Sequence, residues 1–336
     1  MKPNIFNVAT KELSQDAFFT WLIQWADSNN MQYDKELCSA AQHFVKLLIS
    51  KQLDYDKDIA KVEANRQWNN IDIRAKVNDE VLIIIEDKTF TSMHSNQLDT
   101  YKKFASEWCI KNKYQLVCIY LKTGSEAIVS LESVEKKGFS VVTRTELQEF
   151  FNCHSNIRND IFNDFKERII ALEKSNNSFE SLPIKDWNWN SWEGFYQYLQ
   201  SQIDVNGWRY VANPSGGFLG LWWHSKKWEN YNVYLQIEQG NLCFKIGEVY
   251  NNRSHVRNKW FSKLIAHAKK SGRKEIKKPQ RFGSGNYMTV AIIDRQDWLG
   301  NSENIVVLTE VVNTLKNYEK FMDELLLEVN SQAIVN

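Results

Sequence analysis

Two carboxylates and one ammonium group in the first third of the chain have the types and spacing of a metal-dependent hydrolytic site: Asp72, Glu86 and Lys88. Two carboxylates held close together raise each other's pKa unless a cation lies between them, and such oxygen ligands suit Mg²⁺ or Mn²⁺. A metal ion there polarises a phosphoryl oxygen and lowers the pKa of a bound water. The lysine orients that water and offsets charge that grows on the phosphate. The predicted chemistry is hydrolysis of a phosphodiester bond.

These side chains come together only if the chain between them forms a β-hairpin. Two runs rich in β-branched residues, 71–77 and 81–85, flank the turn signal Asn78-Asp79. With a turn of two or three residues, the aspartate falls opposite or diagonal to Glu86, within ~5 to 8 Å at the backbone. Because successive side chains of a strand alternate, the glutamate and the lysine share one face and the residue between them points away.

The pattern acidic-x-Lys is weak by itself, because it occurs by chance in many proteins. This chain contains it four times, at 86–88, 135–137, 164–166 and 275–277. Only the first occurrence directly follows an apolar β-run, so only there does the pattern end a predicted buried strand. The alternative is that these charges form a solvated strand edge that guards against aggregation.

The elements that must position this hairpin are helices and strands in alternation. Apolar residues at three- and four-residue steps predict amphipathic helices at 14–26, with Ser14 as N-cap, and at about 35–50. The other elements predicted in this half are a strand at 62–66, a helix at 95–111, a buried strand at 116–121, a short strand at 139–143, and helices at 144–152 and 158–173. Strand, helix and buried strand in succession indicate an α/β sheet with crossovers.

With these residues in this order, the chain resembles the PD-(D/E)XK nuclease superfamily. The matching segments are Ile71-Asp72-Ile73, Ile85-Glu86-Asp87-Lys88 and Gln97-Leu98-Asp99-Thr100-Tyr101. The resemblance covers about residues 4 to 150 and implies a restriction-endonuclease-like mixed sheet flanked by helices. It implies Asp72 and Glu86 as metal ligands, helped by the main-chain carbonyl of Asp87. It also implies Lys88 as the catalytic lysine and Gln97 as a residue that faces the site.

Further similarities extend this resemblance towards the N-terminus. Many bacterial members open with a helix that carries an acidic residue and a Trp-Leu pair, which resembles Asp16 and Trp21-Leu22. They often carry a glutamate on the first strand, to which Glu63 is similar, and this implies Glu63 as a further metal ligand and catalytic residue. Asp16 is also what an ordinary helix carries near its start. Ile71 stands where the first motif can have a proline, which many members lack.

The second half of the chain differs from the first in its amino-acid composition. The polar segment 174–184, with Pro183 near its end, predicts a linker between a domain at 1–173 and one at 185–336. Nine of the thirteen tryptophans lie between Trp187 and Trp298. An antiparallel sheet is predicted from the alternating runs at 218–223, 231–238, 242–247 and 287–293, with helices at about 252–271 and 304–329 on one face. This is an α+β domain whose aromatic residues fit either a core or a surface for bases or another ligand.

A basic stretch lies within this second domain. From Arg253 to Arg281 there are eleven Lys or Arg residues against one acidic residue, Glu275. Such a stretch can follow a phosphate backbone and supply salt-dependent affinity, although a solvated helix face has the same composition. The residues predicted to bind nucleic acid are Arg253, Arg257, Lys259, Lys263, Lys269, Lys270 and Arg273.

The bulk properties exclude several classes of protein. A chain of 336 residues suits two domains, and its 43% apolar and 25% charged residues are those of a globular protein rather than a disordered one. The net charge of +1 gives no global attraction to nucleic acid, so binding must come from local patches. The five scattered cysteines form no zinc or disulfide pattern. The most apolar run, 81–85, is too short for a bilayer that needs ~20 residues, and we expect a cytoplasmic protein with no membrane partner.

The leading hypothesis is a Mg²⁺- or Mn²⁺-dependent nuclease whose second domain binds the substrate or licenses cleavage. We expect DNA rather than RNA as the substrate, and cleavage of both strands of a duplex would favour a homodimer. A role in bacterial defence fits the resemblance. Two alternatives stay open: a catalytically inactive binding module that keeps the nuclease fold, and a regulatory protein that senses a ligand through the tryptophan-rich domain.

Overall fold

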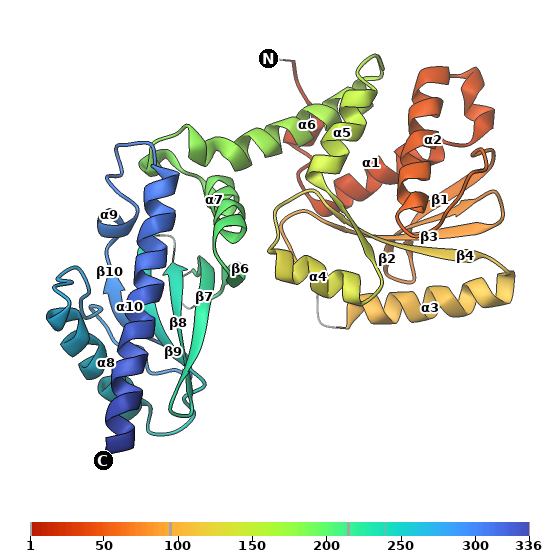
Figure 1. Ribbon diagram of the computed structural model, residues 1–336. Coiled ribbons are helices and arrows are strands. Elements are labelled where there is room, and N and C mark those ends of the chain that lie inside the picture. Colours follow the sequence, from red (N-terminus) through yellow and green to blue (C-terminus); the bar gives the residue numbers. More distant parts are fainter. Residues whose placement is uncertain (1, 94–95, 214–215, 239, 336) are drawn as a thin grey trace. The chain divides into compact units, whose positions relative to one another are not determined.

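The computed structural model describes residues 2–93, 96–213, 216–238 and 240–335. The chain divides into two compact units (Figure 1). The first holds the residues up to Glu126 and Ser130–Ser175, and the second holds Ala127–Val129 and the residues from Asn176 onward. Among the described residues, no helix has the length and apolarity that crossing a membrane requires.

The first unit is built on a five-stranded mixed sheet in the order β1-β2-β3-β4-β5. The β1, β2 and β3 strands are antiparallel neighbours, whereas β4 and β5 follow as parallel strands. The strands are β1 Val62–Trp68, β2 Ile71–Val77, β3 Val81–Lys88, β4 Gln115–Lys122 and β5 Ser140–Thr143. The helices are α1 Glu12–Gln24, α2 Lys35–Ser50, α3 Gln97–Asn112, α4 Ile128–Lys136, α5 Arg144–Cys153 and α6 Asp160–Asn176. The predicted α/β class and the mixed sheet are confirmed.

Helices cover both faces of this sheet, as Figure 1 shows, and every residue of β3 is therefore buried. One core joins Ile83 and Ile85 to aromatic side chains of α1, α2, α5 and α6, such as Phe19 and Phe165. The other core joins Ile84 to residues of α3, including Leu98. The alternation of β3 thus sends odd-numbered side chains towards α1 and even-numbered ones towards α3.

The turn between β2 and β3 fixes the register of the hairpin. Asn78 and Asp79 both adopt positive φ, 52° and 55°, which asparagine and aspartate tolerate better than most residues. The Asn78 side chain also accepts hydrogen bonds from the backbone N–H groups of Ala60 and Lys61, at 2.9 and 3.0 Å. Val77 therefore pairs with Val81, and the predicted hairpin is present.

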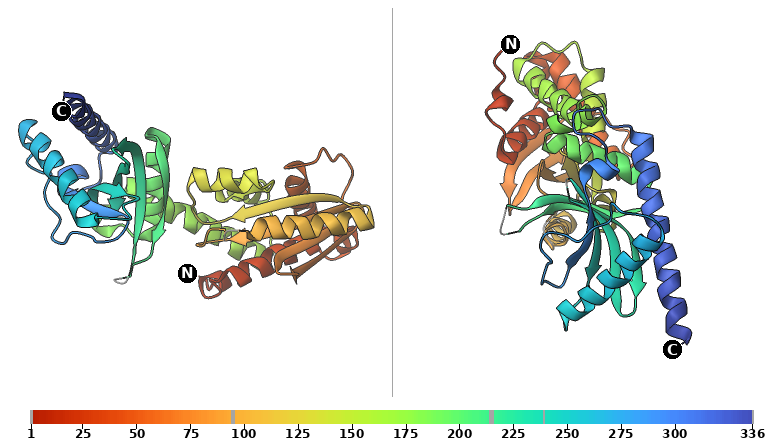
Figure 2. Two further views of the ribbon diagram at one scale, coloured as in Figure 1. Left: turned by 90° about the horizontal axis from the view of Figure 1, so that it is seen from below. Right: turned by 90° about the vertical axis from the view of Figure 1, so that its left-hand side faces the viewer.

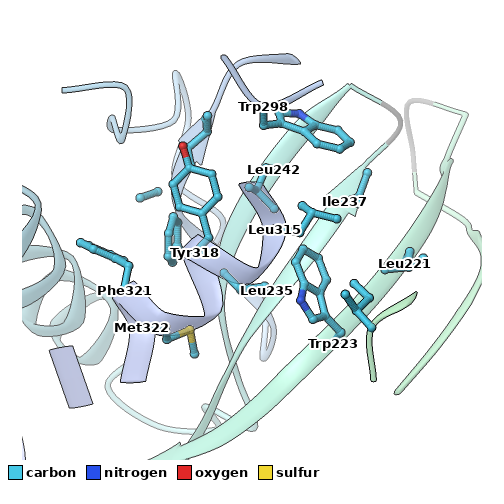
Figure 3. Packing of buried hydrophobic residues seen from close by; sticks show 14 of the residues in the cluster. Leu221, Trp223, Leu235, Ile237, Leu242, Trp298, Leu315, Tyr318, Phe321 and Met322 are labelled. Atoms are coloured by element: carbon cyan, nitrogen blue, oxygen red, sulfur yellow. The ribbon is translucent and has the colours of Figure 1, made fainter. Parts of the chain in front are cut away.

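The second unit is an antiparallel five-stranded sheet in the order β10-β9-β8-β7-β6, as predicted for an α+β domain. Helix α10 lies along this sheet in Figure 1 and Figure 2, and Figure 3 shows its Leu315 and Phe321 in the core with Trp223 and Leu235. The strands are β6 Val205–Val211, β7 Phe218–Trp228, β8 Tyr231–Glu238, β9 Asn241–Gly247 and β10 Met288–Ile293. The helices are α7 Trp189–Gln202, α8 Arg253–Lys270, α9 Arg295–Trp298 and α10 Leu308–Val335.

The segment predicted as a linker, 174–184, contains the boundary between the two units but is mostly helical rather than a loop. Helix α6 continues to Asn176, and 3₁₀ turns follow at Asn177–Glu180 and Ile184–Asp186. Phe179 and Ile184 are buried in the core of the second unit. The polar residues of this segment indicated a loop, but two apolar side chains among them attach it to that core, which stabilises it as folded structure.

Candidate active site on the β2–β3 hairpin

The hairpin brings together the three residues that carry the predicted chemistry. Ile73 pairs with Ile85, which places Asp72 and Glu86 beside each other at the next position of the two strands. The Nζ atom of Lys88 forms an ion pair with Glu86 and lies 3.8 Å from Oδ2 of Asp72. The same Oδ2 atom accepts a hydrogen bond of 2.9 Å from the backbone N–H of Asp87. One ammonium group therefore lies beside two carboxylates on neighbouring strands.

Burial sets the electrostatics of this group. The Glu86 side chain is 0% exposed and that of Lys88 is 9% exposed, whereas Asp72 keeps 25% of its surface in water. Burial and then the nearby charge of Asp72 raise the pKa of Glu86. Burial by itself would lower the pKa of Lys88, but the two carboxylates outweigh burial and hold that pKa above its ordinary value. A further cation at the carboxylates would stabilise the charged form of Glu86.

Helix α3 completes this face of the site. Its first residue, Gln97, donates a hydrogen bond of 2.7 Å from Nε2 to Oε1 of Glu86, as its predicted place near the site requires. The same Nε2 atom lies 3.0 Å from the hydroxyl oxygen of Tyr101, one helical turn later. Tyr101 belongs to the matching segment 97–101 but was not predicted to lie at the site, although its spacing of four residues from Gln97 places both on one side of the helix.

The donor set fits a hard divalent cation. Oε2 of Glu86 and Oε1 of Gln97 are buried and have no hydrogen-bond partner within the described part of the chain. Within that part, no group of three or more His, Cys, Asp and Glu residues has a metal-binding arrangement. A metal ion here would therefore take the carboxylates of Asp72 and Glu86, with main-chain oxygen such as that of Asp87 and with water. Mg²⁺ commonly binds in this way.

The side chain of Asp87 points away from Glu86 and Lys88, as predicted, and meets helix α1. Its Oδ1 atom accepts a hydrogen bond of 2.5 Å from Gln15, whose own Oε1 accepts one of 2.8 Å from Thr123. Burial and the neighbouring Asp16 raise the pKa of Asp87. The structure thus places Asp16 beside Asp87, with Arg66 at 3.8 Å, and burial and then the charge of Asp72 raise the pKa of Asp16.

A different acidic residue of α1 reaches the segment that follows Lys88. Oε1 of Glu12 accepts hydrogen bonds from the backbone N–H of Thr89, at 3.0 Å, and from the hydroxyl of Thr91, at 2.8 Å. Burial would raise the pKa of Glu12, but these hydrogen bonds and the charge of Lys88 outweigh burial and lower it. Glu12 was not among the predicted residues, although it lies one helical turn before Asp16.

Strand β4 supports the same segment from the other side. Oε2 of Glu126 accepts a hydrogen bond of 2.9 Å from the hydroxyl of Tyr120 and lies 3.3 Å from Nζ of Lys122. Lys122 also donates a hydrogen bond of 2.6 Å to the carbonyl of Thr91. The side chains of Lys122 and Glu126 are 3% and 2% exposed, so this ion pair is a buried support for the site rather than a surface contact.

Close packing makes one glycine necessary here. A Cβ atom on Gly124 would lie 1.9 Å from the carbonyl oxygen of Thr89, far inside van der Waals contact. The neighbouring backbone N–H of Thr123 donates a hydrogen bond of 3.1 Å to the carbonyl of Lys88. Only a residue without a side chain lets the chain after β4 approach the end of β3 this closely.

The structure does not bring Glu63 into this site. Its carboxylate forms ion pairs of 3.1 Å with both Arg74 and Lys76, and its backbone pairs with that of Lys76. Lys76 lies four residues along β2 from Asp72, a separation of about 13 Å at the usual rise of a strand. The implied role of Glu63 as a metal ligand is therefore not supported, because its strand position and its cation partners hold it elsewhere.

The basic stretch of the second unit lies on α8 and the segment after it. Five of the seven predicted residues have partners: Arg253 and Arg257 donate to backbone carbonyls, and Lys259, Lys270 and Arg273 form ion pairs with glutamates. The side chains of Lys263 and Lys269 have no ion pair or hydrogen bond with any described residue. Of the tryptophans on β7, Trp223 and Trp228 are core residues, whereas Trp222 is only partly buried and lies beneath the guanidinium of Arg209.

Comparison with known proteins supplies one match. A family model described as the PD-(D/E)XK nuclease superfamily matches residues 3–204, which is more than half of the chain. The match includes the whole hairpin and continues past Ser175 through helix α7 of the second unit. The chain matches no curated protein and no solved structure.

Proposed function

The chain belongs to the PD-(D/E)XK nuclease superfamily, and from this premise we propose that it hydrolyses phosphodiester bonds of nucleic acid in a metal-dependent reaction. One observation carries the proposal. The Nζ atom of Lys88 lies beside carboxylates from two strands, while a buried oxygen of Glu86 has no hydrogen-bond partner among the described residues. A buried carboxylate oxygen without a partner in the protein is available to a metal ion, and here it lies beside a second carboxylate and a lysine.

Each residue of the site has a role in this proposal. Asp72 and Glu86 hold the cation, which when bound polarises a phosphoryl oxygen and lowers the pKa of a bound water. Gln97 fixes the orientation of Glu86 through their hydrogen bond. Lys88 orients the attacking water and stabilises the negative charge that develops on the phosphate. Its interaction is stronger than in water because the group is buried.

The same observations give less support to the two alternative functions. An inactive binding module has no need for a buried Glu86 with a raised pKa next to a lysine, since such a group costs stability unless something binds it. A sensing role for the second unit is compatible with nuclease activity and would add to it. We propose Mg²⁺ or Mn²⁺ as the ion, DNA rather than RNA as the substrate, and a role in bacterial defence in the cytoplasm, where a homodimer would cut both strands.

Removal of the metal is expected to abolish cleavage. The purified protein is incubated with single-stranded and duplex DNA and RNA in Mg²⁺, in Mn²⁺ and in EDTA, and the products are resolved by electrophoresis. We expect cleavage with either ion and none in EDTA, because without the cation nothing activates the water. The control is readdition of Mg²⁺ to the EDTA sample, which restores cleavage. Full activity in EDTA, or none on any substrate with either ion, contradicts the proposed function.

The two lysines of α8 without a partner among the described residues, Lys263 and Lys269, are expected to contribute salt-dependent affinity. Replacement of both with alanine removes two cations without breaking an ion pair. A plot of log affinity against log salt concentration has a negative slope. If both lysines bind phosphate, that slope becomes less negative by about 0.9 for each phosphate that is no longer neutralised. The matched control replaces Lys259 and Lys270, whose charges are already paired, and should change the slope less. An unchanged slope in the first variant rules out phosphate binding by these lysines.

A further inference from the structure

Phe90 lies two residues after Lys88, and 58% of its surface is exposed. It makes no ring contact with another aromatic side chain of the described residues and belongs to none of the three hydrophobic cores. A single exposed apolar side chain is common on protein surfaces and proves nothing by itself. The significance of Phe90 comes from what surrounds it.

The residues on both sides of Phe90 are held in place. Thr89 is 0% exposed, and its backbone N–H donates a hydrogen bond to Glu12. Thr91 donates its hydroxyl hydrogen bond to the same carboxylate oxygen and accepts one from Lys122 at its carbonyl. Helix α1 and strand β4 therefore fix the backbone at Phe90, and the ring cannot be withdrawn into a core by a local shift of this segment.

The short distance along the chain places Phe90 close to Lys88. The hydroxyl of Thr89 lies 3.3 Å from that of Thr123, which in turn contacts Gln15, so Thr89 points to the side of Asp87. Strand β3 ends at Lys88, and the Phe90 side chain is mostly exposed where Thr89 is buried. Two residues of chain span at most about 7 Å, so Phe90 lies close to the position that a phosphate at Lys88 would take.

We propose that Phe90 stacks on the nucleobase next to the scissile phosphate, and that the site takes a strand in which this base is unpaired. The inference rests on the proposed function and names its substrate class. A base inside a duplex is already stacked on both sides, whereas an unpaired base offers a free π-face to an aromatic ring. The hydrogen bonds that hold Thr89 and Thr91 favour this contact, since less backbone entropy is lost when the base binds.

The test measures binding and cleavage separately. Anisotropy of a labelled single-stranded oligonucleotide and of its duplex, with Ca²⁺ in place of Mg²⁺, gives the Kd, and initial rates in Mg²⁺ give KM and kcat. Replacement of Phe90 with alanine should raise the Kd and the KM for the single strand by about tenfold, the effect of removing the ring on which one base stacks. Phe90→Trp should restore both values, whereas Phe90→Leu, which is apolar but lacks a π-face, should resemble the alanine variant.

Tyr33 provides a matched control, because it is an aromatic residue of the same unit with 75% exposure. Tyr33→Ala should leave the Kd and the KM unchanged, and circular dichroism checks that each variant is folded. The stacking contact is overturned if Phe90→Ala has the Kd and the KM of the unsubstituted protein, or if Phe90→Leu has them. In either case, cleavage by the unsubstituted protein still supports the proposed function. If the unsubstituted protein binds the single strand no better than the duplex, the proposal that the site takes an unpaired base is overturned.

Discussion

Replacement of Lys88 with alanine is expected to lower kcat by about 10²- to 10³-fold, the effect of removing one group that stabilises transition-state charge. The ammonium group lies beside both carboxylates and is buried, and no other described cation lies within ion-pair distance of Glu86 and Asp72. Binding of Mg²⁺, measured by calorimetry, should persist or strengthen, because a positive charge next to the ion has been removed. Rates are measured on the best substrate of the parent protein.

Two further variants separate the catalytic role of Lys88 from a structural one. Lys76→Ala removes a lysine from the same face of the same sheet, where it pairs with Glu63, and should leave kcat within a factor of about two, since a surface pair contributes little. Glu86→Gln keeps the shape of the side chain but should lose both cleavage and metal binding. A Lys88→Ala variant that is folded and cuts at the parental rate contradicts the assignment.

Replacement of Phe165 with alanine is expected to destabilise the first unit by about 3 to 5 kcal/mol, the usual cost of a buried phenylalanine. Its ring is fully buried on α6, stacks on Phe18 at 3.8 Å between centroids, and has Phe6 at 4.9 Å and Phe19 at 5.1 Å. The cavity cannot collapse easily, because aromatic rings from separate segments line it. Urea unfolding followed by circular dichroism measures the loss of stability.

The same helix offers a control in Ile170, which is 39% exposed. Ile170→Ala should change the free energy of unfolding by no more than about 0.5 kcal/mol, as is usual for surface positions. Nine of the thirteen tryptophans lie in the second unit, so their fluorescence follows that unit and should change little in the Phe165 variant. Equal losses of stability in both variants contradict the proposed role of the aromatic core.

Much of the first unit could be predicted because its signals are local. The stripe of apolar residues in α2, the β-branched runs and the Asn78-Asp79 turn each depend on neighbours a few residues away, and each element formed close to its predicted bounds. Helix α7 was not predicted although Trp192, Phe195, Tyr196 and Leu199 follow the helical spacing. The helical spacing of these residues is the signal that could have found this helix.

Local sequence patterns could not predict which acidic residues lie at the site. Glu12, Asp16 and Glu63 are all plausible from the sequence, and their partners are far away in the chain. Glu12 contacts Thr89 over 77 positions, while Glu63 is held by Arg74 and Lys76 on the neighbouring strand. Which carboxylate reaches the site depends on how α1 packs on the sheet, and no local pattern encodes that.

The sequence by itself determined the hairpin, since strand alternation and a turn of fixed length are enough to place Asp72, Glu86 and Lys88 on one face. Tertiary structure decided the surroundings that give this group its properties. The burial of Glu86, the support of Thr89 and Thr91 by α1 and β4, and the exposed ring of Phe90 all arise from the packing of distant segments. Packing of this kind depends on shape and burial in three dimensions, which residue spacing does not specify.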